Sequence, residues 1–460
     1  MSRLWSSLRD ALRGTHHDYT QGSIRQAIFL LAVPMVLEMA MESVFAVTDV
    51  FFVAKLGAPA VATVGLTESL LTLIYGIAIG LSIGATAMVA RRIGENDPEQ
   101  AAHTAVQAIL LGLIFSVIIG VAGIAFAPRL LTLMGASSDV LANVAFTRVM
   151  LGGNVVILVL FLVNAIFRGA GDAAIAMRVL WLANGINIVL GPMLIFGVGP
   201  FPKLGIVGAA VATTTGRGIG ALFALRQLVR SKGRVTVRRE HLGIEPKVMW
   251  TLLSLSATGT VQVLIGMASW VGLVRIVSTF GSDALAGYTI GIRIITFALL
   301  PSWGLGNAAA TLVGQSLGAK NPERAEQAVW RAALYGAIFL GIVGLLFIIF
   351  ATPIVSIFTS DPRVAHYAVD CLRVIAFGYP LYAYGMVVSQ SFNGAGDTRT
   401  PTLINLGVFW LWEIPLAYVL ARHFGLGPHG VFLSITIAYV TLSIVSPILF
   451  KRGRWKTKHV

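Results

Sequence analysis

The sequence predicts an all-α membrane protein in which twelve transmembrane helices form two pseudo-symmetric six-helix lobes. Three observations predict this class: the composition, the spacing of apolar runs, and an internal duplication. Hydrophobic residues make up 56% of the 460 residues and charged residues only 12%. A soluble protein of this length would need more polar surface than that. The chain is therefore expected to fold as a polytopic membrane bundle.

Apolar runs punctuated by Gly, Pro or charged residues recur along the whole chain. A helix needs about 20 apolar residues to cross a bilayer, and each run is long enough. The predicted spans lie near residues 27–53, 60–90, 101–127, 138–164, 175–197, 207–229, 249–278, 284–314, 325–351, 363–391, 400–423 and 429–450.

The basic residues predict the orientation of these spans. Counted together with the adjoining span ends, both termini and the even-numbered connections carry 24 of the 34 Lys and Arg residues, whereas the opposite connections carry 5. The positive-inside rule then puts both termini in the cytoplasm of a multi-pass inner-membrane protein. The first 25 residues lack an apolar segment leading to a cleavage site, so we expect the first span to be retained. The net charge of +14 does not indicate nucleic-acid binding, because the basic residues gather between apolar runs.

An internal repeat divides the chain into two halves. The segment GENDPEQA at 94–101 matches GAKNPERA at 318–325, and FRGAGD at 167–172 matches FNGAGD at 392–397. The two pairs are separated by 224 and 225 residues, and this nearly constant separation indicates duplication of a six-span unit. We expect the two copies to be related by an axis along the membrane normal, with the substrate path between them. We predict a first lobe with a cytoplasmic tail at 1–229, a cytoplasmic linker at 230–248, and a second lobe with a cytoplasmic tail at 249–460.

Three acids interrupt the first apolar run. Glu38, Glu42 and Asp49 share one stripe of a helix, since Glu42 lies roughly 40° and Asp49 roughly 20° around from Glu38. A carboxylate at membrane depth is costly and normally faces a protein interior or a wet cavity. Glu68, on the next span, lies at a depth within roughly 5 Å of Asp49, so the two could face one another. The stripe predicts a polar pathway with exchangeable protons, although a structural hydrogen-bond network remains the alternative.

Several motifs together resemble the multidrug and toxic compound extrusion (MATE) family. They are VTDVFFVAKLG at 47–57, the paired Gly-x-x-Asx-Pro-Glu loops, the paired GAGD turns, and NIVLGPMLIFG at 187–197. The resemblance covers nearly the whole chain. It implies two six-helix lobes around a central cleft and export of cationic or amphipathic compounds by antiport with protons or sodium ions.

The resemblance also implies roles for individual residues. Asp49 matches the acid of span 1 that binds the coupling ion, and Pro34 matches a proline at which that helix bends in one branch. Asn187 and Pro192 match the family pattern of span 5, but Gly191 stands where relatives commonly have aspartate. We therefore expect ion coupling at Asp49 and Asn187 with Glu38, Glu42 or Glu68 supplying the missing acid, and Pro34 as a conformational hinge.

A second branch of the family carries acids in spans 7 and 10, where this chain has Gln262 and tyrosines instead. The chain thus resembles the branch whose ion site lies in the N-terminal lobe. Candidates for substrate binding are Tyr75, Asn154, Tyr382, Glu413 and Gln262, because ring faces and polar groups suit flat cations. Packing and interhelical hydrogen bonds are the alternative roles for these residues.

Glu413 and Arg293 are the main intramembrane charges of the second half. A lone buried charge is costly and usually has an opposite partner. An ion pair between them is one expectation, and a role of Glu413 in cation or substrate binding is the other.

Other function classes have little support in the sequence. The eight histidines show no His-Glu-x-x-His spacing, and the glycine turns lack the Lys and Ser/Thr of a phosphate loop. We therefore expect no metal, no cofactor and no enzymatic activity, with the proton as coupling ion and Na+ as the alternative. The expected partners are amphipathic or cationic small molecules and the lipid bilayer, without nucleic acid, for a chain that acts as a monomer. Rival functions are a lipid-linked oligosaccharide flippase and, further off, a membrane-embedded enzyme.

Overall fold

The computed structural model describes residues 2–14, 17–230, 233–458 and 460. All regular structure in this described part is helical. The elements in the first half are α1 (Ser2–Arg13), α2 (Ile24–Ala54), α3 (Ala58–Gly94), α4 (Pro98–Leu133), α5 (Ser138–Leu141), α6 (Val144–Gly152), α7 (Asn154–Ala170), α8 (Ala173–Phe196) and α9 (Ile206–Arg230). Those that follow are η1 (Arg239–Leu242), α10 (Pro246–Ser278), α11 (Ser282–Gly318), α12 (Pro322–Ser356), α13 (Pro362–Phe377), α14 (Tyr379–Gly394), α15 (Arg399–Asn405), η2 (Leu406–Glu413), α16 (Ile414–Tyr418), η3 (Val419–His423), α17 (Pro428–Lys451) and η4 (Arg454–Thr457).

The twelve predicted spans correspond to helices of the structure. Within the described residues, 11 helices are long and apolar enough to cross a membrane, and the pair α13 and α14, bent by 55°, supplies the twelfth if it is one span. The bend lies at Gly378, between the two helices. The predicted all-α fold of twelve transmembrane helices is therefore confirmed.

The internal repeat is also visible in local backbone geometry. Asn96 and Lys320, 224 positions apart, are the two non-glycine residues of the described chain with positive φ, at 59° and 56°. Each precedes a capped helix start, where Asp97 accepts a hydrogen bond from the amide of the third residue of α4 and Asn321 does the same for α12, both at 3.0 Å. These side chains satisfy amides that the first helical turn leaves without partners. The two copies thus begin their third span in the same way.

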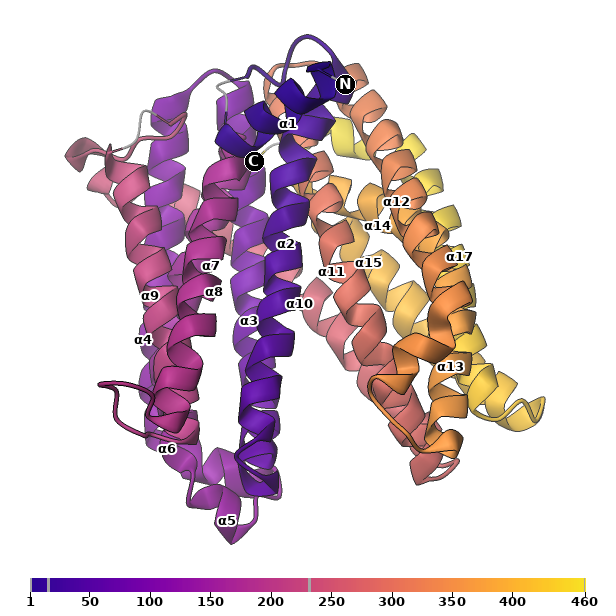
Figure 1. The fold of residues 1–460 in the computed structure, drawn as a ribbon. Coiled ribbons are helices and arrows are strands. Elements are labelled where there is room, and N and C mark those ends of the chain that lie inside the picture. Colours follow the sequence, from indigo (N-terminus) through magenta and orange to yellow (C-terminus); the bar gives the residue numbers. More distant parts are fainter. Residues whose placement is uncertain (1, 15–16, 231–232, 459) are drawn as a thin grey trace.

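The helices form two bundles that meet at one end and diverge at the other (Figure 1). We call α2 to α9 the first lobe and α10 to α17 the second lobe. Both chain ends lie where the bundles meet, which we call the termini end, and the far end is the opposite end. Across the boundary α2 packs on α11, and α3 packs on both α10 and α11.

Glycine residues allow this close approach at the termini end. A Cβ atom on Gly94 of α3 would lie 2.0 Å from the carbonyl oxygen of Gln315 on α11, and one on Gly318 would lie 2.2 Å from that of Arg91. Because no side chain larger than hydrogen fits there, the backbones of the two lobes touch directly. The Gln315 amide also donates to the Gly169 carbonyl at 2.9 Å. The lobes are therefore joined by backbone contacts at this end.

The contact between lobes continues to about half the depth of the bundle. There Ser43 of α2 donates a hydrogen bond of 3.4 Å to the carbonyl of Phe297 on α11. Toward the opposite end, α3 and α11 separate (Figure 1). The predicted hinge, Pro34, is buried inside α2, which runs through it as one continuous helix. A bend at Pro34 remains a prediction.

Candidate functional site

The acid stripe of α2 faces the interior of the first lobe, where α8 packs against α2. Glu38 is 1% exposed. Its carboxylate accepts hydrogen bonds from the guanidinium of Arg168 on α7 at 2.7 Å and from the amide of Asn164 at 3.4 Å. Charge-assisted hydrogen bonds of this length are the strong ones in proteins. Glu38 is therefore held as one member of a buried ion pair.

The next acid of the stripe has a different arginine partner. Glu42 accepts hydrogen bonds from the Asn184 amide on α8 at 2.9 Å and from the Arg217 guanidinium on α9 at 3.4 Å. Arg217 is buried and also donates to the Tyr75 hydroxyl at 2.7 Å. It lies over the rings of Phe45 and Tyr75, 5.5 Å and 5.6 Å from their centroids. Cation–π contacts of this kind add to the ion pair, so Arg217 links α2, α3 and α9.

Asp49 and Glu68 differ from the inner two acids because their side chains form no hydrogen bond or ion pair with any described residue. Asp49 is half-buried and Glu68 is exposed. Their charges interact with each other across α2 and α3. The charge of Arg217 acts on Asp49, and that of Arg293 from α11 acts on Glu68. The structure thus brings Asp49 and Glu68 together as carboxylates without a bonded cation, on the side of the Ser43 contact nearer the opposite end.

Span 5 contributes amides to the same interior. The Asn187 amide donates to the Thr213 hydroxyl on α9 at 2.7 Å. Gly191 leaves open space, since a Cβ atom there would meet only the Asn187 side-chain oxygen, at 3.8 Å. An acid at position 191 would therefore lie beside Asn187, and this chain places glycine there instead. Among the described residues, Asn187 forms no hydrogen bond with any of the acids of the stripe.

Asn154 has a structural environment. Its amide donates to the carbonyls of Ser116 at 3.0 Å and Leu151 at 2.7 Å, and the side chain is fully buried. These bonds join α7 to α4 and to the end of α6. The geometry favours the interhelical role over substrate binding.

The predicted residues of the second lobe form a separate group. Tyr382 accepts a hydrogen bond from the Trp303 indole at 3.3 Å, and its ring lies 4.5 Å from that of Tyr439. Gln262 is buried, and its side-chain oxygen has no partner in the described structure. No hydrogen bond or ion pair joins these residues to the acids of the first lobe within the described chain.

The expected ion pair between Glu413 and Arg293 is not formed, although the structure describes both side chains. Glu413 ends the π-helical segment η2 and is 3% exposed, while Arg293 is exposed on α11. Glu413 instead lies near the buried hydroxyls of Tyr288 and Tyr439, which have no hydrogen-bond partner among the described residues. The prediction failed because spacing along the chain does not define how η2 is rotated relative to α11.

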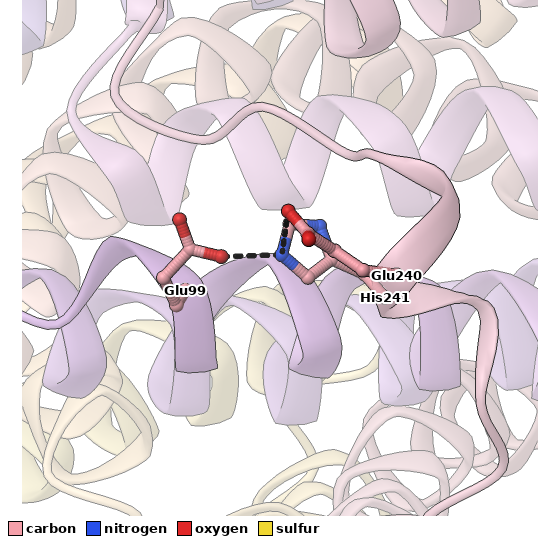
Figure 2. A group of neighbouring side chains, drawn as sticks. All are labelled: Glu99, Glu240 and His241. Carbon is pink, nitrogen blue, oxygen red and sulfur yellow. Dashed lines mark hydrogen bonds and ion pairs between the residues drawn. The ribbon is translucent and has the colours of Figure 1, made fainter.

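A cluster of possible metal ligands lies at the termini end, where Glu99, Glu240 and His241 approach one another (Figure 2). His241 is buried, and its Nε2 lies 2.5 Å from Glu99. Its Nδ1 accepts the backbone amide of Arg238 at 3.0 Å, which assigns the ring proton to Nε2. A nitrogen that carries a proton cannot bind a metal ion. The cluster is better explained as a hydrogen-bonded contact that holds the linker against α4.

An open apolar groove of about 440 Å³ runs along α8 and contains none of the predicted site residues. Its lining is formed by Trp181, Leu182, Gly185, Ile186, Val189 and Leu190. The groove carries no charged group.

Sequence reasoning missed the arginines of this site. The sequence patterns assign no role to Arg168 or Arg217. An arginine in the middle of an apolar span requires an acidic partner, and this signal pointed to Arg217. No comparable signal marked Arg168, which lies in the last turn of α7.

Similarity to known proteins covers nearly the whole chain. A model of the MatE family matches residues 34–193 and 258–419. "Probable multidrug resistance protein NorM" of Thermotoga maritima is 26% identical over 450 residues, which are 95% of this chain and 94% of that protein. "FAD transporter" of Shewanella oneidensis is 26% identical over 438 residues, 95% of this chain and 96% of that protein.

A solved structure described as "Outward-facing conformation of a multidrug resistance MATE family transporter of the MOP superfamily" has the same architecture. Its TM-score is 0.89 at 27% identity, covering 95% of this chain and 97% of that one. The match extends over both lobes, as does the family model. With its duplicated halves and its many apolar spans, this chain belongs to the MatE family of multi-pass membrane transporters.

Proposed function

We propose that the protein is a cation-coupled antiporter that exports amphipathic or cationic drugs across the inner membrane by alternating access. The proton is the proposed coupling ion, with Na+ as the alternative, and the chain acts as a monomeric transporter rather than as an enzyme. The termini end faces the cytoplasm in this proposal, and the structure represents an outward-facing state. The names of relatives such as the Thermotoga protein support drug export.

One observation carries the coupling proposal. Glu38 and Glu42 are bonded to arginines, whereas Asp49 and Glu68 have no bonded cation among the described residues. Two neighbouring carboxylates without a partner repel each other, and a proton or a cation relieves that repulsion. They also lie between the Ser43 contact and the opposite end, where the two lobes diverge. Coupling ion and cargo would compete for this pair.

The proposal is tested by transport in proteoliposomes with imposed gradients. Asp49→Asn should abolish drug-driven proton movement, because an amide cannot exchange a proton at that position. Asp139→Asn, which changes an exposed acid in α5, is the matched control and should transport normally. Separate proton and sodium gradients identify the coupling ion. Normal antiport by folded Asp49→Asn protein would rule out the assignment.

A second candidate function is transport of an anionic cargo. A lipid-linked oligosaccharide would also be such a cargo, because it carries negative charge. The observation that favours it is Arg293, an exposed arginine of α11 without a bonded carboxylate among the described residues. The relative named "FAD transporter" points in the same direction. Counterflow of FAD and of ethidium in the same liposomes separates the two candidates. Exchange of FAD alone would favour the anionic cargo.

A further inference from the structure

Glu68 and Arg293 lie at matching depths on the two lobes. Both α3 and α11 begin at the opposite end, at Ala58 and Ser282. Glu68 follows the start of α3 by 10 residues, about 15 Å at 1.5 Å per residue. Arg293 follows the start of α11 by 11 residues, about 16 Å on the same scale. Opposite charges therefore stand at the same level on helices that face each other across the lobe boundary.

The side chains of Glu68 and Arg293 are not buried, and neither forms an ion pair within the described structure. Both are exposed, and the charge of Arg293 acts on Glu68, yet they form no direct ion pair in the described structure. The lobes already touch at Ser43 and Phe297, deeper in the molecule. Toward the opposite end the outer halves of α3 and α11 diverge (Figure 1). A rotation that brings these halves together would bring Glu68 and Arg293 into contact.

We propose that Arg293 is a tethered counter-cation that pairs with Glu68 when the opposite end closes. The negative charge of Glu68 is repelled by Asp49 and attracted by Arg293. A cationic cargo bound at the carboxylates holds Arg293 away, and its departure leaves Glu68 free to bind the arginine. The ion pair then stabilises the closed end until the lobes reopen. This inference rests on the alternating access of the proposed function, but not on the coupling role of Asp49.

The closing contact is suited to arginine. A guanidinium can bind a carboxylate through two parallel N–H bonds, and it stays charged at every physiological pH. Lobe closure would exclude water from the pair and strengthen the attraction relative to the exposed state. Arg293 is thus a positioning residue that biases the equilibrium between two lobe arrangements, and it does not itself carry the cargo.

The test measures the lobe separation directly. Spin labels are placed on Val61 of α3 and Ser282 of α11, both exposed near the opposite end, in a Cys371→Ala background. Pulsed electron resonance on protein in lipid nanodiscs gives the ratio of short to long distances. Arg293→Gln and Glu68→Gln should each lower the closed fraction at least about fivefold, the scale of typical coupling between sites. Arg293→Lys should restore most of it.

The controls separate a specific pair from a general charge effect. Arg275→Gln removes an exposed arginine of α10 and should leave the distances unchanged. The double variant Glu68→Gln with Arg293→Gln should be no more open than either single variant, since both remove the same bond. Additive effects, unchanged distances in both single variants, or one long distance under all conditions in the parent protein would each overturn the proposal. The labels report closure without transport, so failure of the Asp49 assignment would leave this result readable.

Discussion

Replacing Arg217 by glutamine tests whether this buried arginine holds the first lobe together. The guanidinium, 4% exposed, donates to Tyr75 at 2.7 Å and to Glu42, 23% exposed, at 3.4 Å. Removing one member of a buried ion pair costs about 3–5 kcal/mol, because the other charge remains uncompensated. Water reaches Glu42 in part, so we expect the lower end, about 3 kcal/mol.

The measurement is the thermal unfolding temperature of the detergent-purified protein. Each kcal/mol shifts Tm by about 1–2 °C in a chain of this size, so Arg217→Gln should lower Tm by about 3–6 °C. Arg226→Gln, an exposed arginine on the same helix, should change it by less than about 1 °C. Adding Glu42→Gln to Arg217→Gln should recover at least about 1 kcal/mol, because the unpaired carboxylate is gone. A double variant no more stable than Arg217→Gln alone would refute the reasoning.

Three further variants probe other parts of the structure. Gly94→Ala should force the lobes apart at the termini end and lower the free energy of unfolding by about 1–3 kcal/mol, since its Cβ would lie 2.0 Å from an α11 carbonyl oxygen. Gly65→Ala on the same helix has open space around it and should raise the free energy of unfolding by about 0.5–1 kcal/mol. Equal effects of the two variants would contradict the packing account. Glu413→Gln should leave Tm unchanged or raise it, because no bonded cation in the described structure loses its partner; a large fall would reveal a missing interaction. Burial raises the pKa of Tyr19 to about 12, so its hydroxyl stays protonated and donates to the Gly171 carbonyl just after α7. Tyr19→Phe should therefore lower the free energy of unfolding by about 1 kcal/mol, equally at pH 6 and pH 8. A difference between the two pH values would contradict this.

The membrane helices and the duplication could be predicted from the sequence because both depend on local patterns. Apolar run length decides which segments span the membrane, and Gly-x-x-Asx-Pro-Glu builds the same capped helix start twice. Asn96 and Lys320 adopt the same unusual backbone conformation for that reason. The stripe of Glu38, Glu42 and Asp49 followed equally from helical periodicity.

The partners of those acids could not be predicted in this way. Arg168 meets Glu38 across 130 positions of sequence, and Arg217 meets Glu42 across 175. Such contacts depend on how each helix is rotated and how deep it lies against its neighbours, which apolar periodicity leaves open. The same uncertainty led to the expected Glu413–Arg293 pair, which the structure does not form.

By itself, then, the sequence determined a duplicated twelve-span membrane protein with three acids on one face of its first span, because the hydrophobic effect and helical periodicity act on neighbouring residues. The tertiary structure alone decided that two of these acids are bonded to arginines while Asp49 has no bonded cation among the described residues and interacts with the charge of Glu68. It also decided that the charge of Arg293 acts on Glu68 of the first lobe and that Arg293 forms no ion pair with Glu413. Charge pairing between distant helices is selected by packing, and packing is a property of the whole fold.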